Sequence, residues 1–325
     1  MKAIICTDPG KIESLVLGNL PSPIPGKDEV LIDIYYAGVN YPDVLISEGK
    51  YQFKPVLPFS PGGEVSGIIQ AIGDDVHSFA VGDKVCAAMS WGGFAEYVVA
   101  SESNTYLLSS GAPLDKSAIL LETYATAYYA LKDRAAMRSN ETIAVLGASG
   151  GTGTACIQLA RLFGAKVIAI CSSEDKCEFA LKQGAQIVLN SSTMDIKSAL
   201  KRLGGVDVVF DPVGGELSEA CFRSLKPEGR HLVVGFASGT VPSIPWNLPL
   251  LKSASIVGVF WGNFWRNSPE RNRSNVTQLL RWLAEGKINP AINKVFSLDH
   301  AVKAILELKN RQVIGKNLIA IKSAD

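Results

Sequence analysis

Glycines are concentrated in one short stretch of the chain, and their spacing suggests the binding of a diphosphate. Four of them lie within residues 147–153, after the apolar run 142–146 and before apolar residues at helical spacing. A glycine turn between a strand and a helix lets a dinucleotide diphosphate approach the backbone and bind at the helix N-terminus. The best match to the three-glycine motif is Ala148, Gly150 and Gly153, with alanine in first place. Because this match is incomplete, a glycine-rich turn without a ligand stays open as the alternative.

The residues after the next apolar run, 166–170, favour NADPH over NADH. In NAD-preferring domains an acidic residue ends the second strand and binds the ribose 2′-hydroxyl. Here Cys171 stands at that position, and Ser172, Ser173 and Lys176 follow, which can bind a 2′-phosphate. A charge-assisted hydrogen bond contributes roughly 1.5–3 kcal/mol, so we expect a clear preference for NADPH. The alternative role of the two serines is to cap the next helix, and the two roles are compatible.

These residues need a parallel sheet to position them, and the pattern of the chain predicts one. Residues 1 to about 110 read as many short strands separated by turns, among them a strand over 64–72, which is typical of a compact barrel-like β domain. From about residue 114 helices and strands alternate, which predicts a doubly wound α/β fold that begins with a helix over 118–131 and ends with a strand over 255–260. Two further helices are predicted over 274–286 and 298–309. A tail of about 60 residues follows, and we expect it to return to the first domain. The predicted domains are therefore 1–117 with 266–325, and 118–265.

The composition is that of an ordinary globular protein and argues against several classes of partner. The 325 residues carry a net charge of +1 without a basic block, which argues against nucleic acid as the main partner. No uncharged apolar run approaches the roughly 20 residues that span a membrane. The six cysteines lack close pairs, as in a reduced cytoplasmic protein, and the three histidines are isolated. We therefore expect no metal site, no membrane partner and a cytoplasmic location.

Seven motifs, taken in order, resemble those of one enzyme family. They lie at residues 37–43, 61–67, 92–97, 123–128, 147–153, 211–215 and 257–262. Each is weak alone, but together they span essentially the whole chain. On these motifs the chain resembles the zinc-independent quinone oxidoreductase (zeta-crystallin-like) branch of the medium-chain dehydrogenase/reductase superfamily. The resemblance implies a Rossmann dinucleotide-binding domain inserted into a GroES-like, β-rich catalytic domain.

The chain departs from the zinc-containing relatives at the metal ligands. Those alcohol dehydrogenases have a cysteine where Asn40 or Tyr41 stands here, and a histidine where Gly63 precedes Glu64. They also carry a closely spaced four-cysteine lobe, which this sequence lacks. Without thiolate or imidazole ligands, we expect no catalytic zinc.

The expected absence of zinc restricts the reaction. Reduction of a simple ketone needs a metal or a Tyr/Lys acid–base pair to stabilise the alkoxide. Tyr128 and Lys132 have the spacing of such a pair, but they precede the glycine turn instead of following it, so we interpret the spacing as coincidental. A quinone or an enone needs less help, because the charge that follows hydride addition is delocalised. We therefore expect NADPH-dependent hydride transfer to a quinone or another α,β-unsaturated carbonyl compound.

The resemblance also implies the residues of the site. On the acceptor side it points to Asn40, Asp43 and Tyr51, with the Tyr51 hydroxyl or the Asn40 amide as the donor to the acceptor oxygen. Turn capping is the alternative for Asn40 and Asp43, and Glu64 is expected to order the loop before it. The expected cofactor-binding residues are Thr126, Ala148, Ser149, Gly150, Gly151, Thr152, Gly153, Ser172, Ser173, Lys176, Phe236, Ala237, Phe260, Trp261 and Asn317. For Thr126 and the aromatic residues of this set, core packing is the alternative.

Two other functions stay open from the sequence. An enoyl-thioester reductase would need a basic patch for a phosphopantetheine group, and none is evident. An NADPH-binding protein without turnover is implied by relatives that serve as lens crystallins or bind RNA. Family members commonly dimerise by pairing edge strands of their cofactor domains, so we expect a homodimer through residues 255–260.

Overall fold

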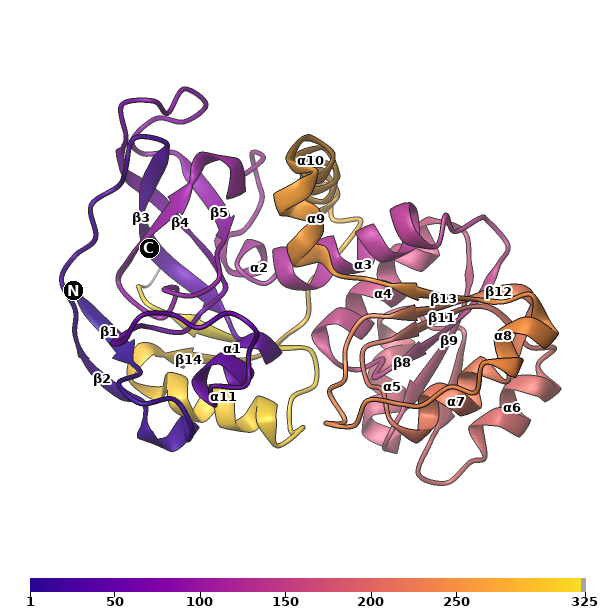
Figure 1. The fold of residues 1–325 in the computed structure, drawn as a ribbon. Coiled ribbons are helices and arrows are strands. Elements are labelled where there is room, and N and C mark those ends of the chain that lie inside the picture. The colour runs from indigo at the N-terminus through magenta and orange to yellow at the C-terminus, as the bar shows by residue number, and fades with distance from the viewer. Residues whose placement is uncertain (323–325) are drawn as a thin grey trace. The chain divides into compact units, whose positions relative to one another are not determined.

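The chain forms two compact units in a computed structural model that describes residues 1–322 (Figure 1). The first unit combines Met1–Glu122 with Trp265–Asp325, and the second is Thr123–Phe264. The C-terminal tail lies in the first unit, where its strand pairs with a strand of the N-terminal segment.

The first unit is built on a seven-stranded sheet. Its strands are β3 (Glu29–Gly38), β4 (Glu64–Ile72), β5 (Lys84–Ala88), β6 (Tyr97–Ser101), β7 (Thr105–Leu107), β14 (Ile292–Ser297) and β15 (Lys316–Ala320). The order is β14-β15-β3-β4-β5-β7, and β6 also pairs with β3. β14 and β15 are parallel, whereas the other pairs in this sheet are antiparallel. A separate antiparallel pair consists of β1 (Lys2–Ile5) and β2 (Val16–Asn19).

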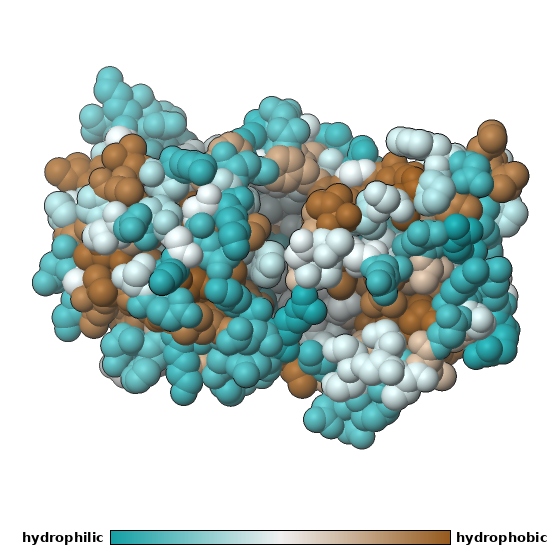
Figure 2. Space-filling view, turned by 60° about the horizontal axis from the view of Figure 1, so that its bottom comes forward, coloured by the Kyte–Doolittle hydropathy of each residue, from teal (hydrophilic) through white to brown (hydrophobic). Residues whose placement is uncertain are grey.

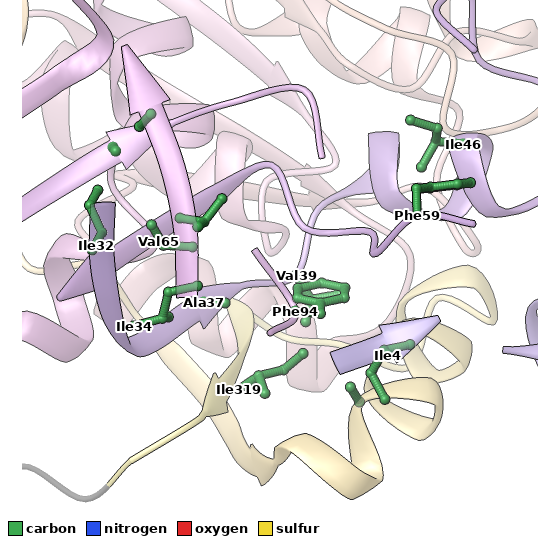
Figure 3. Packing of buried hydrophobic residues seen from close by; sticks show 14 of the residues in the cluster. Ile4, Ile32, Ile34, Ala37, Val39, Ile46, Phe59, Val65, Phe94 and Ile319 are labelled. Atoms are coloured by element: carbon green, nitrogen blue, oxygen red, sulfur yellow. The ribbon is translucent and has the colours of Figure 1, made fainter. Parts of the chain in front are cut away.

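An apolar core holds this sheet in place and so fixes the strand ends that carry polar residues. Ile32 and Ile34 of β3, Val65 of β4 and Ile319 of β15 point into it (Figure 3). Each of these side chains is fully buried. Burial of one such side chain contributes about 1.5–3 kcal/mol, so the register of β3, β4 and β15 is strongly determined.

Four helices complete the first unit: α1 (Tyr41–Ser47), α2 (Leu114–Ser117), α10 (Pro269–Ala284) and α11 (Ala301–Lys309). The sequence predicted α10 and α11 but indicated only a turn where α1 begins. The helix forms because Asn40 is its N-cap and the Asp43 carboxylate accepts a hydrogen bond from the Asn40 backbone N–H at 2.7 Å. This is the reciprocal arrangement of a capping box, and Pro42 suits the first turn.

The second unit is a six-stranded sheet that is parallel throughout. Its strands are β8 (Thr142–Leu146), β9 (Lys166–Cys171), β10 (Ile187–Asn190), β11 (Val206–Asp211), β12 (Leu225–Val233) and β13 (Ser255–Gly258). Helices flank both faces (Figure 1), namely α4 (Gly151–Leu162), α5 (Glu174–Lys182), α6 (Ile196–Arg202), α7 (Glu216–Phe222) and α8 (Asn247–Lys252). The order β10-β9-β8-β11-β12-β13 is that of a Rossmann fold. The predicted fold class is therefore confirmed.

Some predicted elements differ from those observed. The helix expected over 118–131 is broken into π-helical turns, Leu121–Ala125 and Tyr129–Arg134, around the short α3 (Thr126–Tyr128). π-Helical turns occur frequently at functional sites. The last strand was expected to reach residue 260, but β13 ends at Gly258 and α9 (Trp261–Asn267) follows.

The surface carries both apolar and polar side chains. On the face drawn in Figure 2, apolar residues (brown) are interspersed with polar residues (teal), as on most protein surfaces. Within residues 1–322, no helix is both long enough and apolar enough to cross a membrane.

Candidate functional site

The glycine turn joins β8 to α4 and leaves its backbone accessible. Gly147 has a φ of +57°, a left-handed conformation that favours glycine. A Cβ on Gly153 would overlap the carbonyl oxygen of Gly147 and lie 2.8 Å from the Ala148 Cα, so the turn and α4 pack too closely for a side chain. At Gly150, the N-cap of α4, a Cβ would meet only the Gly147 oxygen, at 3.4 Å. The glycine at 153 therefore serves packing, whereas the one at 150 leaves open space.

A second turn follows β11, the strand on the other side of β8 in the sheet. Asp211 organises this turn by accepting hydrogen bonds from the backbone N–H groups of Val213 (2.9 Å) and Gly214 (2.8 Å). It also contacts Ser218 Oγ and His231 Nε2, the latter at 3.0 Å. Burial alone would raise the pKa of Asp211, but the hydrogen bonds from His231, Ser218 and Gly214 hold it below its usual value. The two turns lie at the switch point of the sheet, where doubly wound folds bind ligands.

The residues expected to bind a 2′-phosphate lie together after β9. The Lys176 ammonium is 3.5 Å from the Ser172 hydroxyl, and Ser172 is exposed. Ser173 is the N-cap of α5, but its side chain makes no capping hydrogen bond within the described chain. A hydroxyl and an ammonium therefore face the same place beside a helix N-terminus, which is suitable for an anion.

The other residues expected to bind the cofactor have varied surroundings. Of the turn itself, Ala148 and Ser149 are buried, and Gly151 and Thr152 are the first residues of α4. Phe236 and Ala237 follow β12, and Thr126 begins α3. Phe236 and Phe260 are exposed, whereas Trp261 is buried. Asn317 is buried in the first unit, where its amide donates to the Ala304 carbonyl (3.1 Å) and its oxygen accepts from Asn293 (2.8 Å). The Asn317 side chain is thus engaged in holding β15.

The acceptor-side residues Asn40 and Asp43 belong to a buried network in the first unit. The Asn40 amide nitrogen donates to Glu64 Oε1 at 2.8 Å and lies 3.4 Å from the Gly38 carbonyl oxygen. The second oxygen of Asp43 accepts from the Gly62 N–H at 3.1 Å. The Asn40 amide therefore already has an acceptor within the network.

Lys316 supplies the positive charge of this network. Its ammonium donates to the Val39 carbonyl (2.7 Å) and to Asn40 Oδ1, and lies 3.3 Å from Glu64 Oε1. The other oxygen of Glu64 accepts from the Glu122 backbone N–H at 3.0 Å. Glu64 is fully buried and Lys316 nearly so, and buried charges of this kind persist only when they are paired. Glu64 thus connects β4, β15, the N-terminus of α1 and the segment around Glu122.

This network leaves little capacity for a metal ion. Both oxygens of Asp43 and both oxygens of Glu64 already accept hydrogen bonds. Oε1 of Glu64 also faces the Lys316 ammonium. A divalent cation would have to displace Lys316. Among the described residues, no group of three His, Cys, Asp or Glu side chains is arranged to hold a metal.

Three residues near this network were not singled out by the sequence analysis. They are Lys316, Glu122 and Arg266. The charge of Lys316 lowers the pKa of Asp43 and of Glu122, and the charge of Arg266 lowers that of Glu122. Burial raises the pKa of Asp43 to about 7 and, together with the negative charges of Glu64 and Asp43, that of Glu122 to about 8. Only the tertiary fold brings these residues together, since Lys316 is 276 residues from Asn40.

Comparisons with known proteins agree on one family. A family model described as zinc-binding dehydrogenase matches residues 151–285, and one described as alcohol dehydrogenase GroES-like domain matches residues 26–110. Quinone oxidoreductase-like protein 2 from Bos taurus is 39% identical over 307 residues, which are 93% of this chain and 87% of that protein. Human quinone oxidoreductase is 30% identical over 309 residues, 94% of this chain and 92% of that protein.

Solved structures extend the similarity to the whole fold. The crystal structure of Escherichia coli quinone oxidoreductase complexed with NADPH superposes with a TM-score of 0.91 at 25% identity. The superposition covers 98% of this chain and 100% of that one. The similarity therefore includes both units.

Proposed function

Because the chain belongs to the medium-chain dehydrogenase/reductase superfamily, as a protein of the quinone oxidoreductase type, we propose that it transfers a hydride from NADPH to a quinone or another conjugated carbonyl compound. The single observation that carries this proposal is the open N-cap of α4 at Gly150, at the switch point of the parallel sheet. Backbone N–H groups and the helix dipole at that N-terminus suit the diphosphate of a dinucleotide. Gly150, Gly151 and Thr152 would hold that group.

The surroundings of β9 support NADPH as the cofactor. The strand ends at Cys171, so the position that carries an acidic residue in NAD-preferring domains has no carboxylate, and Ser172 and Lys176 face the same place. The NADPH complex of the Escherichia coli relative is consistent with this choice. When bound, the reduced nicotinamide supplies the hydride, and the protein supplies orientation and hydrogen bonds.

The family model's name implies zinc, but the donor set of this chain does not fit a zinc ion. Asn40 and Gly63 offer neither thiolate nor imidazole, and the carboxylates of Asp43 and Glu64 are used by backbone N–H groups, Asn40 and Lys316. We therefore propose a zinc-independent reaction. An acceptor whose charge is delocalised after reduction requires no Lewis acid, which supports quinones and enones over simple ketones.

A screen of acceptors tests this proposal. Purified protein is mixed with NADPH or NADH and with a quinone, an enone or a simple ketone, and oxidation of the cofactor is followed by its absorbance. We expect turnover with NADPH and the quinone or the enone, and none with the ketone. A protein that turns over none of these acceptors, or reduces only the ketone, would contradict the proposal.

We also propose that two copies of the chain form a homodimer through the second unit. β13 is an edge strand of the six-stranded sheet, and edge strands offer unpaired backbone groups to a partner. Large apolar side chains near it are exposed, among them Trp246 (84%), Leu250 (78%) and Leu251 (75%). Sedimentation of the protein and of its Leu250→Glu variant tests the dimer. A wild-type monomer, or a variant that remains dimeric, would contradict this interface.

A further inference from the structure

Glu122 lies near the buried network, but its carboxyl group takes no part in the hydrogen bonds of that network. Both oxygens of Asp43 and both of Glu64 accept hydrogen bonds, as described above. Glu122 contributes its backbone N–H to Glu64, but no residue within 1–322 donates a hydrogen bond to its side chain. Glu122 is also partly exposed, whereas Asp43 and Glu64 are buried. Its carboxyl is therefore available to a ligand.

The neighbours of this carboxyl leave space beside it. A Cβ placed on Gly63 would lie 3.6 Å from Glu122 Oε1, so glycine at position 63 keeps one side of the carboxyl uncovered. Tyr51 is close enough that the charge of Glu122 raises the pKa of its hydroxyl, although burial of Tyr51 is the larger cause. The Tyr51 hydroxyl, too, makes no hydrogen bond within the described chain. The Tyr51 hydroxyl is thus within the electrostatic range of the Glu122 carboxyl.

Arg266 contributes a positive charge near both groups. Its guanidinium packs on the rings of Phe53 (4.8 Å) and Trp265 (4.9 Å), and one of its nitrogens is 3.3 Å from Ser90 Oγ. Its positive charge lowers the pKa of both Tyr51 and Glu122. Such a charge also stabilises negative charge that develops on a nearby acceptor.

The charges around Glu122 favour its protonated form at neutral pH. Although Glu122 is partly exposed, the surrounding chain desolvates its carboxyl. This desolvation and the negative charges of Glu64 and Asp43 raise its pKa to about 8, against the opposing effect of Lys316 and Arg266. The Glu122 carboxyl is therefore largely protonated at neutral pH.

We propose that the Glu122 carboxyl is the acid that protonates the acceptor after hydride addition, with the Tyr51 hydroxyl binding the acceptor oxygen. This inference rests on the proposed function and assigns a residue to its second step. Neither residue needs to move away from a partner, since neither has one among the described residues.

With an enone as the acceptor, a hydride would leave a C–H bond of the reduced nicotinamide and form a C–H bond at the β-carbon. The π electrons of the C=C bond would move into an enolate. The O–H bond of Glu122 then breaks, and its proton bonds to the α-carbon of the enolate. The carboxylate left on Glu122 takes a proton from water. With a quinone, the same proton bonds to the oxygen that carries the negative charge.

Isotope labelling in Glu122→Gln tests the assignment. Glutamine keeps the size of the side chain but cannot give the proton, so we expect kcat/KM for an enone to fall by about 10²-fold. In D2O, the wild type is expected to place deuterium on one face of the α-carbon of an α-substituted enone, and the variant on both faces. For the wild type, kcat/KM is level below a pH of about 8 and falls above it. The control is Glu13→Gln, an exposed glutamate of the same unit, which should change neither result.

The outcomes separate this inference from the function that it assumes. NADPH binding by Glu122→Gln, measured by titration, shows that the variant is folded. Wild-type turnover with an unchanged deuterium pattern in Glu122→Gln would overturn the role of Glu122 and leave the proposed function standing. Absence of wild-type turnover with every acceptor would overturn both. A loss of rate with the deuterium still on one face would also count against Glu122, since a residue that only supports the structure would give that result.

Discussion

The glycine turn of the second unit and the buried network of the first unit prepare a site in opposite ways. The turn works through missing side chains: Gly150 leaves the N-terminus of α4 open, and Gly153 lets α4 pack on β8. The network works through side chains that neutralise one another, with Lys316 between Glu64 and Asn40. The turn is made by consecutive residues, whereas the network joins residues as far apart as 276 positions.

This difference determines what a substitution does in each region. In the turn, an added methyl group only occupies space, so the change in stability or binding depends on which atoms surround that position. In the network, removal of one charge leaves another charge buried without a partner, which costs several kcal/mol. Substitutions in the turn should therefore be able to change cofactor binding without changing stability, whereas substitutions in the network should change the stability of the fold as well.

The largest effect is expected from Lys316→Met. This substitution leaves the buried Glu64 carboxylate and Asn40 Oδ1 without their ammonium, so we expect the free energy of unfolding to fall by about 3–5 kcal/mol in chemical denaturation. The matched control is Lys294→Met on β14, whose 3.0 Å ion pair with Glu307 is on the surface and contributes at most about 1 kcal/mol. Adding Glu64→Gln to Lys316→Met should recover part of the loss. Equal effects of the two lysine variants would contradict the buried network.

Two alanine substitutions separate packing from binding in the turn. Gly153→Ala puts a Cβ against the Gly147 carbonyl, so we expect a loss of about 1–3 kcal/mol of stability. Gly150→Ala meets only one atom at 3.4 Å, so its stability should stay within about 0.5 kcal/mol of the wild type while NADPH binds at least about tenfold more weakly. Calorimetry and cofactor titration measure both quantities. If Gly150→Ala bound NADPH like the wild type, the turn would not be the diphosphate site.

A smaller effect, confined to one cofactor, is expected from Lys176→Ala. The ammonium lies beside Ser172, where we place the 2′-phosphate, so the dissociation constant of NADPH should rise by about tenfold and that of NADH should not change. Lys182→Ala, at the other end of the same helix, is the control. An equal loss for both cofactors would show that Lys176 does not recognise the phosphate.

Glu122 is expected to make the stability of the protein depend on pH. Its pKa is about 8 in the folded protein and about 4.5 in the unfolded chain, so the wild type loses stability as the pH rises from about 4.5 to about 8. Glutamine does not titrate. Relative to the wild type, the melting temperature of Glu122→Gln should therefore rise by about 5–10 °C between pH 5 and pH 8. A difference that stays constant with pH would contradict the raised pKa.

The two regions also differ in how much of them the sequence could predict. The turn, β4 and the α/β alternation follow from local patterns, and β4 has the bounds expected for it, Glu64–Ile72. The helix α1 was missed although Asn40, Pro42 and Asp43 carry its start signal, because seven residues are too few for a clear periodicity. The role of Lys316 could not be predicted, because it depends on the pairing of β15 with β3. The hydrogen bond from the Asn40 amide to Glu64 could not be predicted for the same reason, since Glu64 is on another strand.

Transfer of a deuterium label tests the central claim most directly. The protein is treated with a chelator, dialysed, and given an enone together with NADPH that carries deuterium at the reactive carbon of the nicotinamide. The account predicts that deuterium appears at the β-carbon of the reduced product and that added zinc does not raise the rate. Product without the label, or activity that returns only when zinc is added, would contradict it.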